Sequence, residues 1–449
     1  MNKHSKAIAS AACGVYGAAL FGGSLAAYAV AGVPIQWIAL VTFAVAAIFL
    51  LLALGIPSTT GTSDLVALTL YALIVNVAVI LTGKQDTQMP ALATTSYFTF
   101  VSLRYINILC VYLTILYIRT MLEMGKGRTI INITVAIGAV VSLFALYVYI
   151  AQTRGLPEPS RSRIGTSGGE QSVLFTYAFH RALGSFREPA HLAEWLIVPL
   201  FLSMMVKSRL KLVVTCLIAS AILLTGSLTG MISVALGWVA SLIIRSSIKY
   251  SVKQVLGLAA PVLGFALLIF TALVASNSIA NVDLGGVVWE RLQPIIETQS
   301  MEGTNRNYTW DYVFDSPPSL LGVGLGNSGL RFGQYLQIPL VPSFLSLYFN
   351  IAYSAGFIGI IFLVRFLFRP VVGFIKRSTL HPPELVAAYI AYLIVFAIHS
   401  EELSFQFAIL WALATWTGKV RNYSLPTQTG QMSETVTVSS SDVDRMTRV

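Results

Sequence analysis

The chain has 449 residues and a formal net charge of +10 at pH 7, with 56% hydrophobic and 11% charged residues. Soluble globular domains carry about 25% charged residues, so this composition and a mean hydropathy of +0.75 exclude that class. The sequence predicts an all-α polytopic integral membrane protein. Its single membrane domain would cover residues 1–421, and the Ser/Thr-rich segment 422–449 would form a disordered cytoplasmic tail.

Apolar segments in the chain predict about twelve transmembrane helices, because a helix needs roughly 20 residues to cross about 30 Å of hydrocarbon. The segments that start at residues 191, 212, 385 and 404 are short, so we expect them to break or to extend into loops. The expected spans are 8–31, 35–56, 65–83, 97–118, 129–151, 191–206, 212–226, 229–245, 255–275, 344–368, 385–399 and 404–418.

The charged residues predict the orientation of these helices, because lysine and arginine accumulate in short cytoplasmic loops. With the amino terminus inside, every second connection is basic, apart from the connection at 57–64. Both termini are then cytoplasmic, and two large loops at about 152–190 and 276–343, the second the largest, lie outside. This topology accounts for the basic residues, and the chain has no basic module of the kind that binds nucleic acid.

The two outer loops use arginine almost to the exclusion of lysine, which occurs outside only at Lys84. A guanidinium is a planar, forked and permanently charged donor, which suits phosphate or carboxylate better than an ammonium does. The sequence therefore predicts that an anionic substrate binds at the outer face. The arginines of these loops are Arg154, Arg161, Arg163, Arg181, Arg187, Arg291, Arg306 and Arg331.

The first cluster of polar residues lies where the first outer loop enters the sixth span. Pro189 fits the first turn of a helix, where its missing N–H has no acceptor to satisfy. Arg187 and Glu188 would then lie at the membrane surface just before the helix, and Glu194 about one turn deeper, facing the protein interior. The alternative is an Arg187–Glu188 ion pair that only anchors the helix end. His180, His191 and His399 are isolated in the sequence, which favours structural roles.

The second cluster runs from Thr304 to Asp311 and continues through a proline- and glycine-rich segment to Asn327. Arg306 would bind an anion, Asn305 would donate hydrogen bonds, and the aromatic rings would stack on sugars or headgroups. The alternative is a structured loop with an aromatic belt at the membrane interface. Gly324–Gly329 fits G-x-G-x-x-G, but it lacks the βαβ context of a nucleotide site. These glycines instead predict a tight turn with a close backbone approach.

A charged side chain also lies inside a predicted span. Arg104 is about one third of the way into the fourth span, where a charge costs roughly 2.5 to 3.5 kcal/mol on insertion scales. It should therefore face an acidic partner or the substrate cavity, and the sequence favours neither. Zinc, hydrolase and nucleotide motifs do not occur in the chain.

With these residues, the chain resembles the bacterial O-antigen polymerase and O-antigen ligase superfamily of membrane glycosyltransferases. Phe186-Arg187-Glu188-Pro189 is similar to the polymerase-type arginine and E-P segment, and Leu224 to Gly230 to a Ser/Gly turn, although Leu228 stands where the family often has arginine. Arg306, Trp310 and Pro317 to Gly326 resemble the R…W…P…G-x-G run, and Pro342 to Gly359 the final loop-to-helix segment. Ligases typically have His-Asn where this chain has Pro342-Ser343, which favours a polymerase.

The resemblance implies a surface polysaccharide polymerase that transfers a glycan from polyprenyl diphosphate onto a lipid-linked repeat unit. The reaction would occur at the outer face of the bacterial cytoplasmic membrane, without a cofactor or an obligatory metal, because arginines can stabilise the diphosphate leaving group. A chain-length regulator and a lipid-linked glycan flippase are the expected partners. The alternatives are a ligase-type glycan transferase and a 12-helix transporter of lipid-linked or anionic glycan.

Each candidate residue has an expected role in this reaction. Arg187 and Arg306 would bind the donor diphosphate, and Glu188 would be the general base for the acceptor hydroxyl. Glu194, Asp311 and His191 are the next candidates for the base. The further substrate-binding candidates are Arg163, Arg291, Arg104, Tyr308, Trp310 and Asn305.

Overall fold

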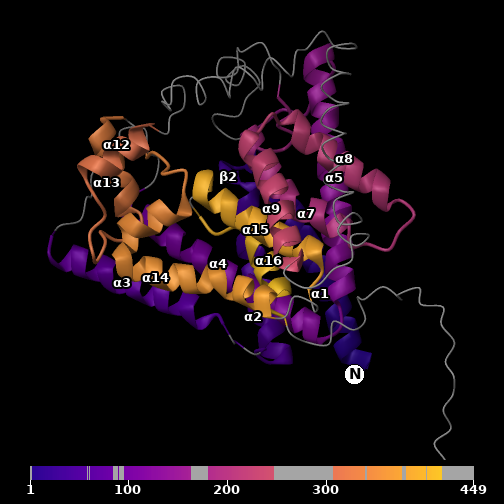
Figure 1. Cartoon of the computed structure of the whole chain (residues 1–449), viewed down its shortest axis with the longest axis horizontal. Coiled ribbons are helices and arrows are strands. Elements are labelled where there is room, and N and C mark those ends of the chain that lie inside the picture. The colour runs from indigo at the N-terminus through magenta and orange to yellow at the C-terminus, as the bar shows by residue number, and fades with distance from the viewer. Residues whose placement is uncertain are drawn as a thin grey trace, which may run out of the picture. The chain divides into compact units, whose positions relative to one another are not determined.

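The computed structural model of the chain is mostly helical (Figure 1). The residues that it describes belong to one compact unit, Met1–Trp416. They are residues 3–57, 59, 61–83, 89–90, 96–162, 181–246, 307–338, 341–376, 381–400 and 402–416. The expected span at 255–275, the expected tail at 422–449 and the candidates Arg163, Arg291, Asn305 and Arg306 lie outside these residues.

The described elements include both long and short helices. They are α1 (Lys3–Gly23), β1 (Ala29–Val30), β2 (Val33–Pro34), α2 (Ile35–Leu54), α3 (Ser63–Leu81), α4 (Tyr97–Glu123), α5 (Gly127–Arg154), α7 (Pro189–Ser203), α8 (Lys211–Leu224), α9 (Leu228–Ser246), α12 (Asn307–Asp315), α13 (Asn327–Leu336), α14 (Leu347–Lys376), α15 (Pro383–Ile398) and α16 (Phe405–Thr415).

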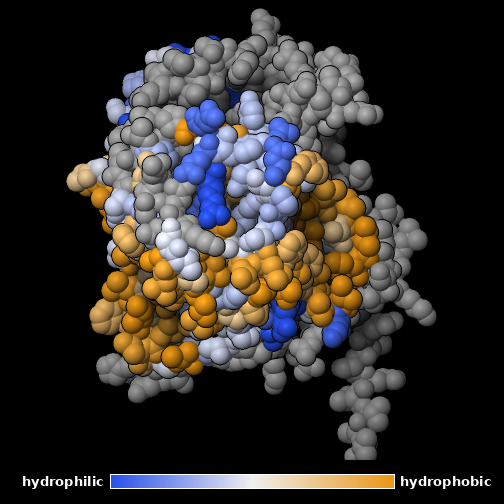
Figure 2. Space-filling view, turned by 90° about the vertical axis from the view of Figure 1, so that its left-hand side faces the viewer, coloured by the Kyte–Doolittle hydropathy of each residue, from blue (hydrophilic) through white to orange (hydrophobic). Residues whose placement is uncertain are grey.

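Five of the described helices, namely α2, α3, α4, α5 and α14, are long and apolar enough to cross a membrane. Their outward-facing side chains include large apolar groups such as Phe49, which is 68% exposed, and Leu52. Figure 2 shows hydrophobic residues gathered across the lower part of one face, with hydrophilic residues above them. These features are those of a membrane protein. The expected number of twelve spans and their orientation stay predictions.

The predicted first span, 8–31, is wrong at its carboxyl end, because α1 ends at Gly23. Gly22 lies against α2 so closely that an added Cβ would be 2.6 Å from Cβ of Ala39. A two-residue turn, Ala31-Gly32, then joins β1 to β2, and both of its residues have positive φ angles. Such a turn suits the twist of a β-hairpin, so the chain reverses here before α2 begins.

Three short helices, α7, α15 and α16, form the interior of the unit. α7, α15 and α16 have 15, 16 and 11 residues, which corresponds to lengths of roughly 17 to 24 Å. Nearly every residue of α7 and α16 is buried, as expected for helices that are apolar on all sides. α15 packs against α7, α9 and α16, and its contact with α9 is close because Gly237 faces Ala387 and Ala391.

α14 lies beside α3 (Figure 1), and it is broken at Gly356, whose φ and ψ angles are 63° and −167°. The break frees the carbonyl groups of Tyr353 and Ser354 from helical hydrogen bonds. Val323 N–H donates to the first at 2.9 Å, and Gly324 N–H donates to the second at 2.8 Å. The glycine-rich loop before α13 therefore satisfies the broken backbone of α14, which a membrane interior requires.

Candidate functional site

The segment that precedes α7 is fixed by hydrogen bonds to two other parts of the chain. Ser185 donates its hydroxyl to the carbonyl of Ser24 at 2.7 Å. Arg181 Nε donates to the carbonyl of Thr225 at 2.6 Å, and Ala182 N–H donates to that of Leu224 at 2.8 Å. This segment therefore has one defined path into α7.

α7 begins where the sequence predicts, at Pro189, and Glu188 is its N-cap residue. Arg187 and Glu188 are both exposed at this helix start. The amino end of a helix carries a positive partial charge, which adds to the guanidinium of Arg187 in attracting an anion. The prediction that these two residues immediately precede the helix is confirmed, and their place at the outer membrane surface and their chemistry stay predictions.

Glu194 lies deeper in α7 and is only 9% exposed, so the prediction that it faces the protein interior is confirmed. Its carboxyl forms a hydrogen bond with the hydroxyl of Ser400, in the turn between α15 and α16. On the other side, Ala193 packs against Gly230 of α9, where an added Cβ would be 2.7 Å from Cβ of Ala193. The Ser/Gly turn at Leu224 to Gly230 and the first turns of α7 are thus neighbours.

Arg104 of α4 forms an ion pair with Glu402, and its guanidinium also lies over the Phe100 ring, 4.9 Å from the ring centroid. Asn107 Nδ2 donates to Glu402 Oε2 at 2.9 Å and to the carbonyl of Leu403 at 3.2 Å. Of the two roles that the sequence leaves open for Arg104, the structure shows the acidic partner. The substrate role of Arg104 stays a prediction.

His191 and His399, which are isolated in the sequence, lie side by side in the structure. Their ring centroids are 5.0 Å apart, with an angle of 47° between the planes. His191 lies in the first turn of α7, and His399 is the C-cap residue of α15. The sequence does not predict this contact, because the two residues are far apart in the chain and each stands alone in its own segment.

These residues form one polar cluster, which we call the α7 cluster. Its members come from the start of α7, from α4 and from the turn between α15 and α16. They are Arg104, Asn107, Arg187, Glu188, His191, Glu194, His399, Ser400 and Glu402. The cluster offers cationic, acidic and imidazole groups at the end of a buried apolar helix. Such a set can bind an anion and accept or donate a proton.

The second predicted constellation lies around α12 and α13. Tyr308, Trp310 and Asp311 are exposed on α12, and the Trp310 ring lies 5.1 Å from the ring of Phe349. Tyr335 donates its hydroxyl to Asp315 at 2.6 Å, and this hydrogen bond raises the pKa of Tyr335. The exposed rings of α12 lie over a base of buried aromatic side chains.

That base is a group of stacked aromatic rings at the start of α14. Tyr312, Phe332, Phe344 and Tyr353 are all buried there. Phe344 and Tyr353 have centroids 5.1 Å apart and planes inclined by 13°. The group joins α12, α13 and the segment before α14. The structure thus brings the Trp310, Pro317–Gly326 and Pro342–Gly359 segments together.

Some outer arginines have structural partners. Arg161 donates to the carbonyl of Gly184 at 3.4 Å, and burial lowers the pKa of its guanidinium. Arg181 binds the turn before α9, as described above. The arginine bias of the outer loops is therefore partly a requirement of the fold. Of the outer-loop arginines that the structure describes, Arg187 is exposed and lies directly before a helix.

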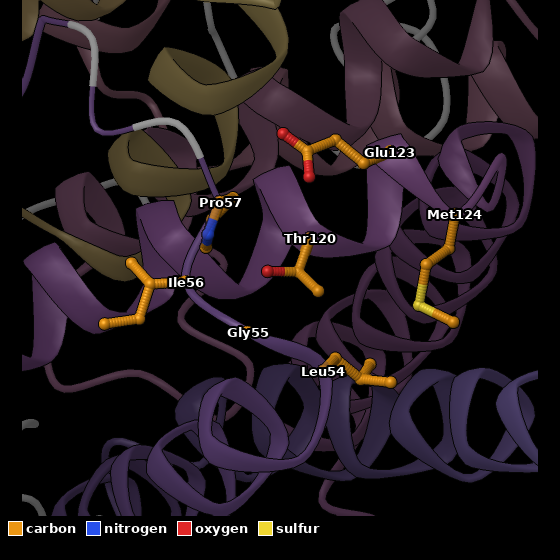
Figure 3. Close-up of a pocket in the computed structure, with 7 residues that line it drawn as sticks. All are labelled: Leu54, Gly55, Ile56, Pro57, Thr120, Glu123 and Met124. Carbon is orange, nitrogen blue, oxygen red and sulfur yellow. The ribbon is translucent and has the colours of Figure 1, made fainter.

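An open pocket of about 360 Å³ lies at the other end of α4 (Figure 3). Glu123 and Thr120 supply its polar side chains, and the rest of the wall comes from Leu54–Pro57 and Met124. Thr120 is about 24 Å along the helix from Arg104, given a rise of 1.5 Å per residue. The pocket is thus separate from the α7 cluster, and its carboxylate does not suit an anionic ligand.

The chain matches no protein-family model and no curated protein sequence.

Proposed function

We propose that the chain is a membrane glycosyltransferase that polymerises surface polysaccharide at the outer face of the bacterial cytoplasmic membrane. The donor is a glycan on polyprenyl diphosphate, and the acceptor is the sugar of a lipid-linked repeat unit. The observation that carries the proposal is the start of α7, where exposed Arg187 and Glu188 adjoin a buried carboxyl and two histidines. An anion site and a candidate base therefore lie side by side.

In the proposed reaction, Arg187 binds the donor diphosphate and stabilises the charge that develops as it leaves. Glu188 accepts the proton of the acceptor hydroxyl as that oxygen bonds to the anomeric carbon of the donor sugar. The bond from that carbon to the diphosphate oxygen breaks, and its electron pair leaves with the diphosphate. Arg306 completes the anion site in this proposal, on the strength of the family resemblance.

The experiment uses the purified full-length protein with lipid-linked repeat units, and products are resolved by gel. Glu188→Gln keeps the shape of the side chain but removes the base, which typically contributes about 10² to 10⁴ in rate. Glu123→Gln, at the pocket on the other end of α4, is the matched control and should polymerise normally. A Glu188→Gln protein that elongates chains within several-fold of the unmodified protein would exclude Glu188 as the base.

Arginine geometry is tested in the same assay. Arg187→Lys keeps the charge but loses the two parallel hydrogen bonds that a guanidinium makes to phosphoryl oxygens. It should lose most activity, whereas Arg209→Lys, also at an exposed position, should not. Equal amounts of polymer from both variants would exclude the paired hydrogen bonds of Arg187 and leave it only an electrostatic role.

Transport of a lipid-linked glycan is the second candidate, and the break in α14 at Gly356 favours it. Transporters often bind substrate where membrane helices are discontinuous. Here, however, the loop that contains Val323 and Gly324 already occupies the freed carbonyls. Vesicles that contain the protein separate the two functions, because transport moves glycan across the bilayer and polymerisation lengthens it.

A further inference from the structure

The proposed reaction assigns no role to the contact between His191 and His399. His191 is exposed, and His399 is half-buried behind it. Their rings are close enough, at 5.0 Å between centroids, for both to meet one small ligand. The two imidazoles, His191 in the first turn of α7 and His399 at the end of α15, make a second set of donors close in the chain to Arg187, which lies four residues before His191.

The turn that carries His399 is held from three sides. Glu402 pairs with Arg104 and accepts a hydrogen bond from Asn107, both on α4. Ser400 binds the carboxyl of Glu194 on α7. Ser404 caps α16 by accepting a hydrogen bond from Phe407 N–H at 3.2 Å. This anchoring fixes the backbone after His399, and α15 fixes the backbone before it, where His399 N–H donates to the carbonyl of Val395 at 2.8 Å.

The charge of the histidine pair depends on pH and on the charged groups around it. An isolated imidazole titrates near pH 6.5, and two rings in contact accept a first proton more readily than a second, because two positive charges repel. Glu188 lies three residues before His191, at the N-cap position of α7. Glu188 and Glu402 favour protonation of the pair, Arg104 and Arg187 oppose it, and Glu194 is buried and hydrogen-bonded to Ser400. A bound anion would bring in the second proton by adding negative charge.

We propose that His191 and His399 together bind a phosphoryl group of the diphosphate, and that this binding takes up a proton. The substrate class rests on the proposed function. Arg187 holds one phosphoryl group, and the two imidazoles donate N–H hydrogen bonds to the other. Each protonated imidazole has two N–H donors, whereas a neutral one has a single donor, so proton uptake strengthens the binding. The histidine pair thus makes diphosphate affinity depend on pH.

The test is calorimetric titration of the purified full-length protein with magnesium-free inorganic diphosphate. Measurements in two buffers of different ionisation enthalpy give the number of protons taken up. The protonation of diphosphate itself is common to all variants, so the difference between variants reports on the histidines. His191→Gln and His399→Gln should each abolish the protein's share of the uptake and weaken binding at pH 6 more than at pH 8. The unmodified protein should gain affinity as pH falls, by up to about tenfold per pH unit for one linked proton.

His381→Gln is the matched control, because His381 lies just before the opposite end of α15 and packs against Phe374. It should leave proton uptake unchanged. His191 is exposed, so its substitution keeps the test valid if His399→Gln fails to fold. The proposal is overturned if the unmodified protein does not bind diphosphate, or if either histidine variant takes up as many protons as the unmodified protein.

The outcome also separates this inference from the proposed function. Proton-coupled binding that depends on both histidines, in a protein that makes no polymer, would support the histidine pair and refute the polymerase. If the histidine variants still polymerise glycan and take up as many protons as the unmodified protein, the polymerase would be supported and the histidine pair refuted.

Discussion

The break in α14 makes Gly356→Ala the sharpest test of the fold. Gly356 has a φ of 63° and a ψ of −167°, a region that is almost confined to glycine. An added Cβ would also be 2.1 Å from the carbonyl oxygen of Leu320. The backbone strain costs about 1 to 3 kcal/mol. If the loop moves away, the hydrogen bonds from Val323 and Gly324 are lost, at about 0.5 to 1.5 kcal/mol each.

The expected destabilisation by Gly356→Ala is therefore about 2 to 6 kcal/mol. Gly373→Ala is the control in the same helix, because Gly373 has no atom within 4 Å of the added Cβ. Alanine is the better helix former there, so this variant should gain about 0.5 to 1 kcal/mol. Thermal denaturation in detergent, followed by intrinsic fluorescence, ranks the three proteins. Equal melting of both variants would refute the account of the break.

Three further predictions concern packing, electrostatics and orientation. Gly237→Ala would put a Cβ 2.4 Å from the carbonyl oxygen of Ala387, so the free energy of unfolding should fall by about 1 to 3 kcal/mol in the same thermal assay. Glu402→Gln removes the charge that pairs with Arg104 in a partly exposed site and should cost less than about 1 kcal/mol, so a larger loss would mean that the turn depends on this ion pair. A reporter fused after Ser316 should score outside and one after Arg209 inside, and a cytoplasmic score at Ser316 would invert the proposed topology.

Local sequence signals predicted the start of α7 well. Pro189 can occupy a first helical turn but not a helix interior, so the helix start followed from one residue. Glu194 then had to lie one turn further on, and the structure buries it. The close approach of the glycine-rich loop was also predicted, since glycines with positive φ at positions 322, 324 and 326 serve that purpose.

The long-range contacts could not be predicted in the same way. Nothing near Arg104 in the chain shows that its partner is Glu402, because the pair depends on how α4 packs against α16. The contact between His191 and His399 likewise depends on the packing of α7 against α15. The end of α1 was missed for a different reason: residues 24–31 are apolar enough to continue a span, and only the Ala31-Gly32 turn indicates the reversal.

The short helices give the α7 cluster its chemical setting. α7 and α16 are buried on almost all sides, so the polar groups at their ends cannot be surrounded by lipid. A helix of about 17 to 24 Å in a layer of about 30 Å leaves polar ends below the surface unless other helices enclose them. Here α4 supplies Arg104 and Asn107 to the turn that precedes α16. Pairing with Glu402 lowers the cost of placing the Arg104 charge within a span, and in the proposed function the protein around the α7 cluster would strengthen its interactions with a diphosphate by excluding part of the water.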